Sequence, residues 1–117
     1  MPTLREHKRG DYMKDINCQY KDSLGNPVDI TGIKILAQFR LDSDCPVAFQ
    51  YSSDQNTIQM VDSTIGKYKL VGRIINHTPG VYTCDIEFIP PDGKIFTPVT
   101  ELILPIVNDY SRDANGN

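Results

Sequence analysis

Few side chains in this sequence stand in patterns that could carry out chemistry. His7 and His77 have no neighbouring cysteine or serine with which either would form a local nucleophile motif. Asp42 and Asp44 could offer carboxylate oxygens to a calcium ion, but the D-x-[DN]-x-[DN]-G loop of a calcium site is missing, and turns are rich in aspartate for backbone reasons. We therefore expect no catalytic residue, no metal site and no cofactor.

The three cysteines do not change that expectation. Cys18, Cys45 and Cys84 stand in no CxxC or CxxH spacing, so neither a zinc site nor a dense disulfide framework is indicated. Cys18 and Cys84 fall on the inward-facing positions of two expected strands, an arrangement that could bridge two sheets. Because the first residues lack the apolar stretch of a signal peptide, we expect a cytoplasmic start and favour two free thiols over a bridge.

Length and charge exclude several classes of protein. The 117 residues suffice for one hydrophobic core, and 39% of them are hydrophobic, with no tryptophan. With 12 basic against 15 acidic side chains the net charge is −3, so no overall field attracts a polyanion and nucleic acid is not an expected partner. No apolar segment approaches the ~20 residues that cross a bilayer, so no membrane partner is expected either.

Residues 1–11 form an expected basic arm in front of the domain. Arg5, Lys8 and Arg9 make this segment basic, whereas the remainder of the chain is acidic. Such an arm is either solvated surface or a segment laid on an acidic neighbour, and the sequence leaves both interpretations open. We expect the domain itself over residues 12–110 and a flexible polar tail over residues 111–117.

Alternation of apolar and polar residues predicts short strands throughout the domain. The clearest pattern covers residues 33–41, and a second clear one covers residues 82–88. Weaker alternation or extended character is found at residues 12–20, 47–52, 57–61, 68–74 and 95–107.

Two turn segments carry the strongest local signals. Residues 21–32 include Gly25-Asn26-Pro27, which is expected to turn two alternating runs back on each other, and Asp92-Gly93 is expected to join residues 82–88 to residues 95–107. No window sustains the helical period over three turns. The sequence therefore predicts an all-β sandwich or barrel of about seven to eight short strands.

The order of these motifs resembles a known family. It is similar to the immunoglobulin-like β-sandwich of tailed-bacteriophage virion proteins, as in the amino-terminal domain of upper baseplate proteins. The matching residues are Arg9-Gly10-Asp11, residues 22–32, Gln38-Phe39-Arg40, residues 79–88 and Asp92-Gly93-Lys94. Pro98 and Pro105 depart from the smoother last strand expected in that family. The resemblance implies an immunoglobulin-like antiparallel β-sandwich.

The same resemblance implies a function without catalysis. It points to a structural protein of the virion, in the tail, neck or baseplate, present in the host cytoplasm before assembly, with copies of itself and other virion proteins as partners. A capsid decoration protein is the alternative. A carbohydrate- or receptor-binding module ranks lower, because the tyrosines fall mostly on inward-facing positions.

Three surfaces are candidates for the contacts that such an assembly needs. They are the basic arm, the loop at residues 42–46, and the proline-bearing edge at residues 95–105. The candidate interface residues are Arg5, Lys8, Arg9, Asp42, Asp44, Ile95, Pro98 and Pro105.

Overall fold

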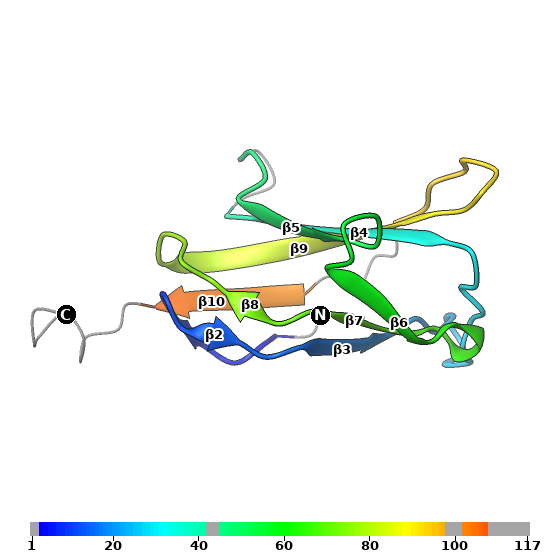
Figure 1. Cartoon of the computed structure of the whole chain (residues 1–117), viewed down its shortest axis with the longest axis horizontal. Helices are drawn as coiled ribbons and strands as arrows, with labels where there is room; N and C mark the ends of the chain where they lie inside the picture. Colours follow the sequence, from blue (N-terminus) through cyan, green and yellow to red (C-terminus); the bar gives the residue numbers. More distant parts are fainter. Residues whose placement is uncertain (1–2, 42–44, 98–101, 108–117) are drawn as a thin grey trace, which may run out of the picture.

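The chain folds into two layers of β-strands that enclose one hydrophobic core (Figure 1). The computed structural model describes residues 3–41, 45–97 and 102–107. Within these ranges it contains ten strands and one 3-10 turn, η1 (Ser63–Ile65). No described helix has the length and apolar character needed to span a bilayer.

The first layer is a five-stranded sheet. Its strands, in spatial order, are β1 (His7–Lys8), β10 (Leu102–Val107), β9 (Gly80–Ile89), β4 (Lys34–Arg40) and β5 (Phe49–Ser52). β1 runs parallel to β10, and all other neighbours in this sheet are antiparallel. Along β4, β9 and β10 buried residues alternate with half-buried or exposed ones, as the period of two requires.

The second layer is a three-stranded antiparallel sheet with a short extension. Its strands are β3 (Ile16–Gln19), β7 (Lys67–Leu70) and β6 (Ile58–Asp62), in that spatial order. β2 (Tyr12–Met13) pairs with β8 (Arg73–Ile74), so the chain segments that carry β3 and β7 meet a second time. Lys14 and Asp15 separate β2 from β3, and Val71 and Gly72 separate β7 from β8.

Strand order identifies the sandwich as immunoglobulin-like. β3, β7 and β6 correspond to strands B, E and D of that fold, and β10, β9, β4 and β5 correspond to G, F, C and C′. Tyr82, two residues before Cys84, donates its hydroxyl hydrogen to the carbonyl oxygen of Thr78 at 2.6 Å, the tyrosine corner of such domains. The predicted fold class is therefore confirmed. The ten strands outnumber the seven to eight expected because the runs at 12–20 and 68–74 are each interrupted and because β1 forms within the expected basic arm.

Apolar side chains from both sheets fill the core. Among the described residues no polar or charged residue is buried. Three ring stacks connect parts of the core: Phe39 with Phe49 at 4.7 Å, Tyr20 with Phe88 at 4.8 Å, and Phe88 with Phe96 at 5.3 Å between ring centroids. Cys84 is buried at the register position opposite Phe39.

The two predicted turns have different outcomes. Gly25-Asn26-Pro27 does reverse the chain, because Lys21 and Pro27 form an antiparallel bridge. The reversal does not pair the two flanking strands, since β3 and β4 belong to different sheets and the segment crosses between the layers. Gly25 has φ 84°, and the Oδ1 atom of Asp22 accepts hydrogen bonds from the amides of Leu24 and Asn26. The hairpin at Asp92-Gly93 is confirmed, since the backbone of Phe88 exchanges two hydrogen bonds with that of Phe96, at 2.9 and 3.0 Å.

Part of the expected basic arm takes part in the five-stranded sheet. The amide of Leu4 donates to the carbonyl of Ile103 at 2.7 Å, and the amide of Arg9 donates to the carbonyl of Val107 at 2.8 Å. Residues 3–9 thus follow β10, with β1 as their regular portion. The expected tail at residues 111–117 lies outside the described residues.

Candidate functional site

The candidate site is the outer face of the five-stranded sheet, the side turned away from β3, β7 and β6. Residues on this face alternate with the core residues of β4, β5, β9 and β10. Those that matter here are Gln38, Arg40, Gln50, Val81, Asp85, Ile103 and Pro105.

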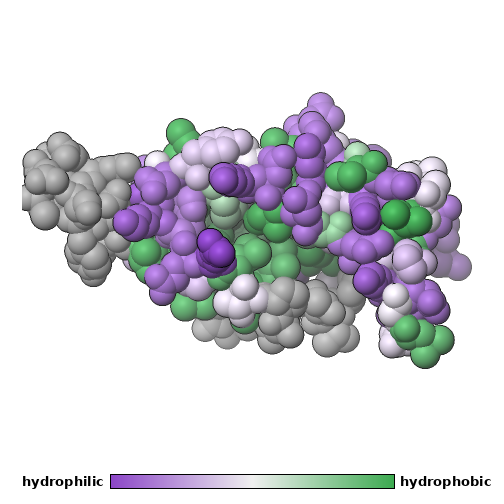
Figure 2. Space-filling model, turned by 90° about the horizontal axis from the view of Figure 1, so that it is seen from below, coloured by the Kyte–Doolittle hydropathy of each residue, from purple (hydrophilic) through white to green (hydrophobic). Residues whose placement is uncertain are grey.

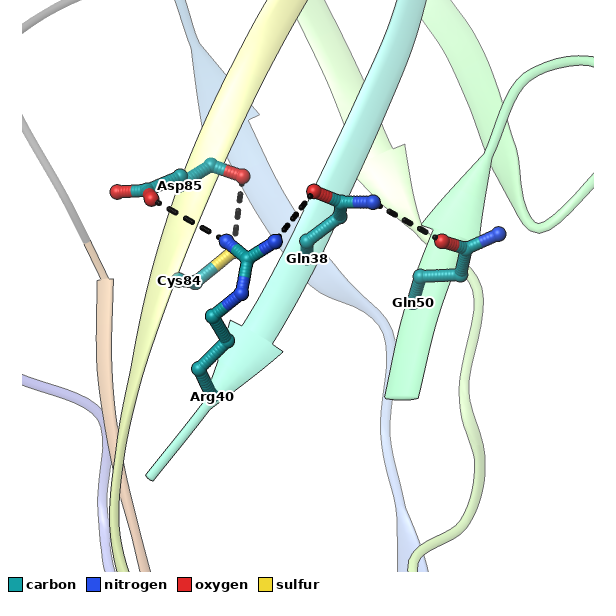
Figure 3. Close-up of polar contacts among 5 residues, drawn as sticks. All are labelled: Gln38, Arg40, Gln50, Cys84 and Asp85. Carbon is teal, nitrogen blue, oxygen red and sulfur yellow. Dashed lines mark hydrogen bonds and ion pairs between the residues drawn. The ribbon is translucent and has the colours of Figure 1, made fainter. Parts of the chain in front are cut away.

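A row of polar side chains crosses three strands of this face (Figure 3). Gln38 lies in register with Gln50 on one side and with Asp85 on the other. The Nε2 atom of Gln38 donates to Oε1 of Gln50 at 3.3 Å, and Nη2 of Arg40 donates to Oε1 of Gln38, also at 3.3 Å. Nη1 of Arg40 lies 3.7 Å from Oδ2 of Asp85. The row is therefore a connected set of donors and acceptors held on rigid strands.

Apolar side chains lie beside this polar row. Val81 on β9 is in register with Pro105 on β10, and Val81 keeps 57% of its surface exposed. Ile103 occupies the outward position two residues before Pro105 and is half-buried. An apolar centre beside hydrogen-bonding groups is the composition of a protein-binding surface rather than of a pocket for a small substrate.

The structure brings together some of the predicted interface residues and separates others. Arg5, Lys8 and Arg9 are exposed on the segment that runs beside β10, and Pro105 lies on β10 itself. Ile95 is 56% exposed in the hairpin at residues 90–95, at the opposite end of β9 from the end where β10 finishes (Figure 1). Asp42, Asp44 and Pro98 lie outside the described residues.

Sequence reasoning missed the polar row on the outer face. Each of the three strands alternates apolar and polar residues, and the polar positions are occupied by Gln38, Gln50 and Asp85. Within a single strand, such a position indicates only that the residue faces solvent. The row exists because the register places the three residues side by side. The alternation predicted which face each residue would occupy, and the pairing of strands decided which residues became neighbours.

Arg73 forms a second polar feature at the margin between the two layers. Its guanidinium carbon lies 4.0 Å from the centroid of the Tyr51 ring, and Nη2 donates to the carbonyl of Gln50 at 2.5 Å. His77 stacks on Phe49 at 4.6 Å between ring centroids. Burial lowers the pKa of His77, and the charge of Arg73 lowers it further, so the ring stacks in its neutral form at neutral pH.

The cysteines carry no bridge in this structure, and at least one of them is shielded. Cys18 is half-buried on β3, and Cys84 is buried on β9. Burial raises the pKa of the Cys18 thiol from 9.0 to about 11, although a hydrogen bond with Tyr68 offsets part of the effect. Among the described residues no group of three or more histidine, cysteine or acidic side chains could hold a metal ion.

Cys18 is expected to react slowly with iodoacetamide at neutral pH. Since the thiolate is the nucleophile, a pKa of about 11 in place of 9.0 lowers the alkylation rate by about a hundredfold relative to the unfolded chain. Mass spectrometry of native and urea-unfolded protein, with the modified peptide identified, measures the ratio. Equal rates in the two states would show that the thiol is not shielded.

Comparison with known proteins adds little to these observations. No protein-family model matches the sequence, and no curated protein matches it. A structure of murine CRIg is similar at 15% sequence identity and a TM-score of 0.44, with 92% of this chain and 94% of that chain covered. At that TM-score the likeness carries no argument, and the fold assignment rests on the strand order and the tyrosine corner.

Proposed function

We propose that this chain is a non-enzymatic structural protein of a tailed-bacteriophage virion, a component of the tail, neck or baseplate that assembles through protein–protein contacts. The outer face of the five-stranded sheet is the surface on which the proposal depends. The motifs at residues 22–32 and 79–88 resemble those of virion β-sandwich domains, and this resemblance is the reason for proposing a virion protein.

The observation that carries the proposal is the composition of the outer face. Val81 is exposed next to Pro105, and the hydrogen-bonded row from Gln50 to Asp85 lies beside them. Protein interfaces combine an apolar centre with polar groups at the rim in the same way. Because these residues stand on paired strands, little conformational entropy is lost when a partner docks.

The neighbouring basic segment adds a charged margin to this face. Arg5, Lys8 and Arg9 are exposed beside β10 and suit a partner with acidic residues at its rim. Charges at such a margin affect the rate of association more than the final affinity. The proposed partners are therefore other virion proteins that present an apolar patch with acidic neighbours.

Incorporation into particles tests the proposal. Virions of the phage that carries the gene are expected to contain the wild-type chain, detected by mass spectrometry of purified particles. Val81→Asp is expected to lower incorporation by about tenfold, because a carboxylate at an apolar contact must be desolvated without a partner.

The matched control is Val61→Asp on β6, in the other sheet. Val61 is 58% exposed and Val81 is 57% exposed, so the two substitutions introduce the same charge at equally exposed positions. Thermal unfolding of both variants checks that each still folds. Absence of the chain from purified particles, or equal incorporation of the two variants, would overturn the proposal. An electron-microscopy map with the chain on the capsid lattice would replace the tail assignment by capsid decoration.

A further inference from the structure

One edge of the three-stranded sheet is open in the described part of the chain. β3 pairs with β7 on one side, and no described strand pairs with its other side. The amide of Tyr20 donates a hydrogen bond to the carbonyl oxygen of Gly66. Ile16 and Cys18 occupy the alternate positions of the same ladder, so their backbone polar groups also point towards β7. Since both backbone polar groups of a residue point to one side in an antiparallel strand, those of Asn17 and Gln19 point away from the sheet. No described strand pairs with them, so they can pair with a strand of another molecule.

An apolar groove runs along this open edge. It has a volume of about 470 Å³ and lies between the two sheets. Ile16, Cys18 and Tyr20 are half-buried on the β3 side of the groove. Its other apolar lining comes from Leu4, Tyr68, Ile86, Phe88 and Leu102. Figure 2 views the molecule from below Figure 1, the side on which β3 lies, and shows hydrophobic residues at the centre with hydrophilic residues to their left and right.

The charges along this edge become complementary when the segment is paired with a second copy of itself in the antiparallel direction. Residues 14–22 read Lys-Asp-Ile-Asn-Cys-Gln-Tyr-Lys-Asp, with Cys18 at the centre. In an antiparallel pair of two such strands centred on Cys18, every charged residue meets an opposite charge. The facing pairs are Lys14 with Asp22, Asp15 with Lys21, Ile16 with Tyr20, and Asn17 with Gln19.

We propose that two copies of this chain associate through the open edge of β3, with the two β3 strands antiparallel about a two-fold axis at Cys18. Asn17 of one copy and Gln19 of the other exchange both backbone hydrogen bonds, and this occurs at two symmetric places. Ile16 of one copy lies opposite Tyr20 of the other along the groove, a β-branched and aromatic pair that favours strand pairing. The two three-stranded sheets become one continuous sheet across the axis.

Charge complementarity favours a second copy over an unrelated strand. A lysine on an exposed edge usually discourages strand addition. In the self-paired arrangement Lys21 of one copy lies opposite Asp15 of the other, so the same lysine becomes attractive. Asp15 is already held in place, because its Oδ1 atom accepts a hydrogen bond from the amide of Gly72 at 2.6 Å and Lys69 lies 3.3 Å from its Oδ2 atom.

This inference deepens the proposed assembly role, on which it rests, by naming one partner as a second copy. The surface is different from the outer face, so the two can fail separately. Loss of particle incorporation in Val81→Asp with an intact dimer supports the proposed function alone. A dimer that depends on β3, formed by a chain that is absent from particles, supports the inference alone.

Sedimentation velocity of the purified chain over a concentration series tests the dimer. Lys21→Glu places a carboxylate opposite Asp15 at two symmetric positions, and we expect the dissociation constant to rise by about tenfold or more. The matched control is Lys94→Glu, which makes the same charge change at an exposed residue of the hairpin at residues 90–95. The control is expected to dimerise like the wild type.

A backbone variant tests the hydrogen bonds. Asn17→Pro removes an amide that faces away from β7 and leaves the intrachain ladder intact, whereas Asn17→Ala keeps the amide. Only the proline variant is expected to lose the dimer. In wild-type protein, hydrogen exchange at the amides of Asn17 and Gln19 is expected to slow as concentration rises. The amide of Cys18, which faces β7, is protected throughout.

Three results would overturn the inference. They are a chain that stays monomeric up to about 1 mM, a dimer that Lys21→Glu leaves unchanged, and exchange at Asn17 that does not depend on concentration. If Asn17→Pro fails to fold, the charge variants and the exchange measurement still decide.

Discussion

Replacing Gly66 by alanine is expected to lower the free energy of unfolding by about 3 kcal/mol. Gly66 ends η1 with φ 74°, in the left-handed region that alanine adopts at a cost of about 1–2 kcal/mol. A Cβ there would lie 2.6 Å from the carbonyl oxygen of Tyr20 and 2.7 Å from that of Val28. Both atoms belong to backbone that crosses close to Gly66, so neither can rotate away.

Gly25→Ala is the matched control for this variant. Gly25 has φ 84°, but nothing lies within 4 Å of a Cβ built on it. We expect a loss of about 1 kcal/mol, from the left-handed conformation alone. Urea denaturation measures both variants. Equal losses would show that the close approach of Tyr20 and Val28 to Gly66 is not a constraint.

Phe88→Ala is expected to lower the free energy of unfolding by about 3–5 kcal/mol, the largest single effect that we predict. Only 1% of the Phe88 surface is exposed. Its ring stacks on Tyr20 at 4.8 Å and on Phe96 at 5.3 Å, and the ring of Tyr68 meets it edge-on at 5.9 Å. Phe88 on β9 thus packs against rings of the second layer and of the hairpin. The alanine variant leaves a cavity that these rigid surroundings fill poorly.

Two further variants separate the volume of Phe88 from its position. Phe88→Leu keeps most of the volume and is expected to cost about 1–1.5 kcal/mol. Phe96→Ala removes a ring of the same size from the half-buried end of the stack and is expected to cost less than Phe88→Ala, because more water already reaches it. Chemical denaturation provides the comparison. A loss for Phe96→Ala equal to that for Phe88→Ala would contradict the central role of Phe88.

The local pattern was sufficient to predict individual strands. Alternation at residues 33–41 and 82–88 predicted β4 and β9, and Asp92-Gly93 predicted the hairpin that follows β9. These predictions succeed because the period of two and the turn chemistry act within a few residues of the chain. The expected strand at residues 12–20 is divided by Lys14 and Asp15 into β2 and β3.

The pairing of strands could not be predicted in the same way. The segment at residues 21–32 makes the predicted tight reversal locally, yet it connects β3 and β4 across the two layers. The same local turn signal fits a hairpin and a crossing, and only the partners of each strand distinguish them. The basic segment at residues 3–9 likewise became part of a sheet because β10 offered it an unpaired edge, which no residue of the segment itself indicates.

Residue type and spacing along one strand are sufficient for the all-β class, for the inward and outward faces of β4 and β9, and for the self-complementary charges around Cys18. Only the pairing of strands places Gln50, Gln38 and Asp85 in one row and Val81 beside Pro105, and leaves one edge of β3 without a partner among the described strands. The physical reason is that neighbours across a sheet are set by long-range pairing and register, whose energy comes from burying both layers against each other rather than from any local preference.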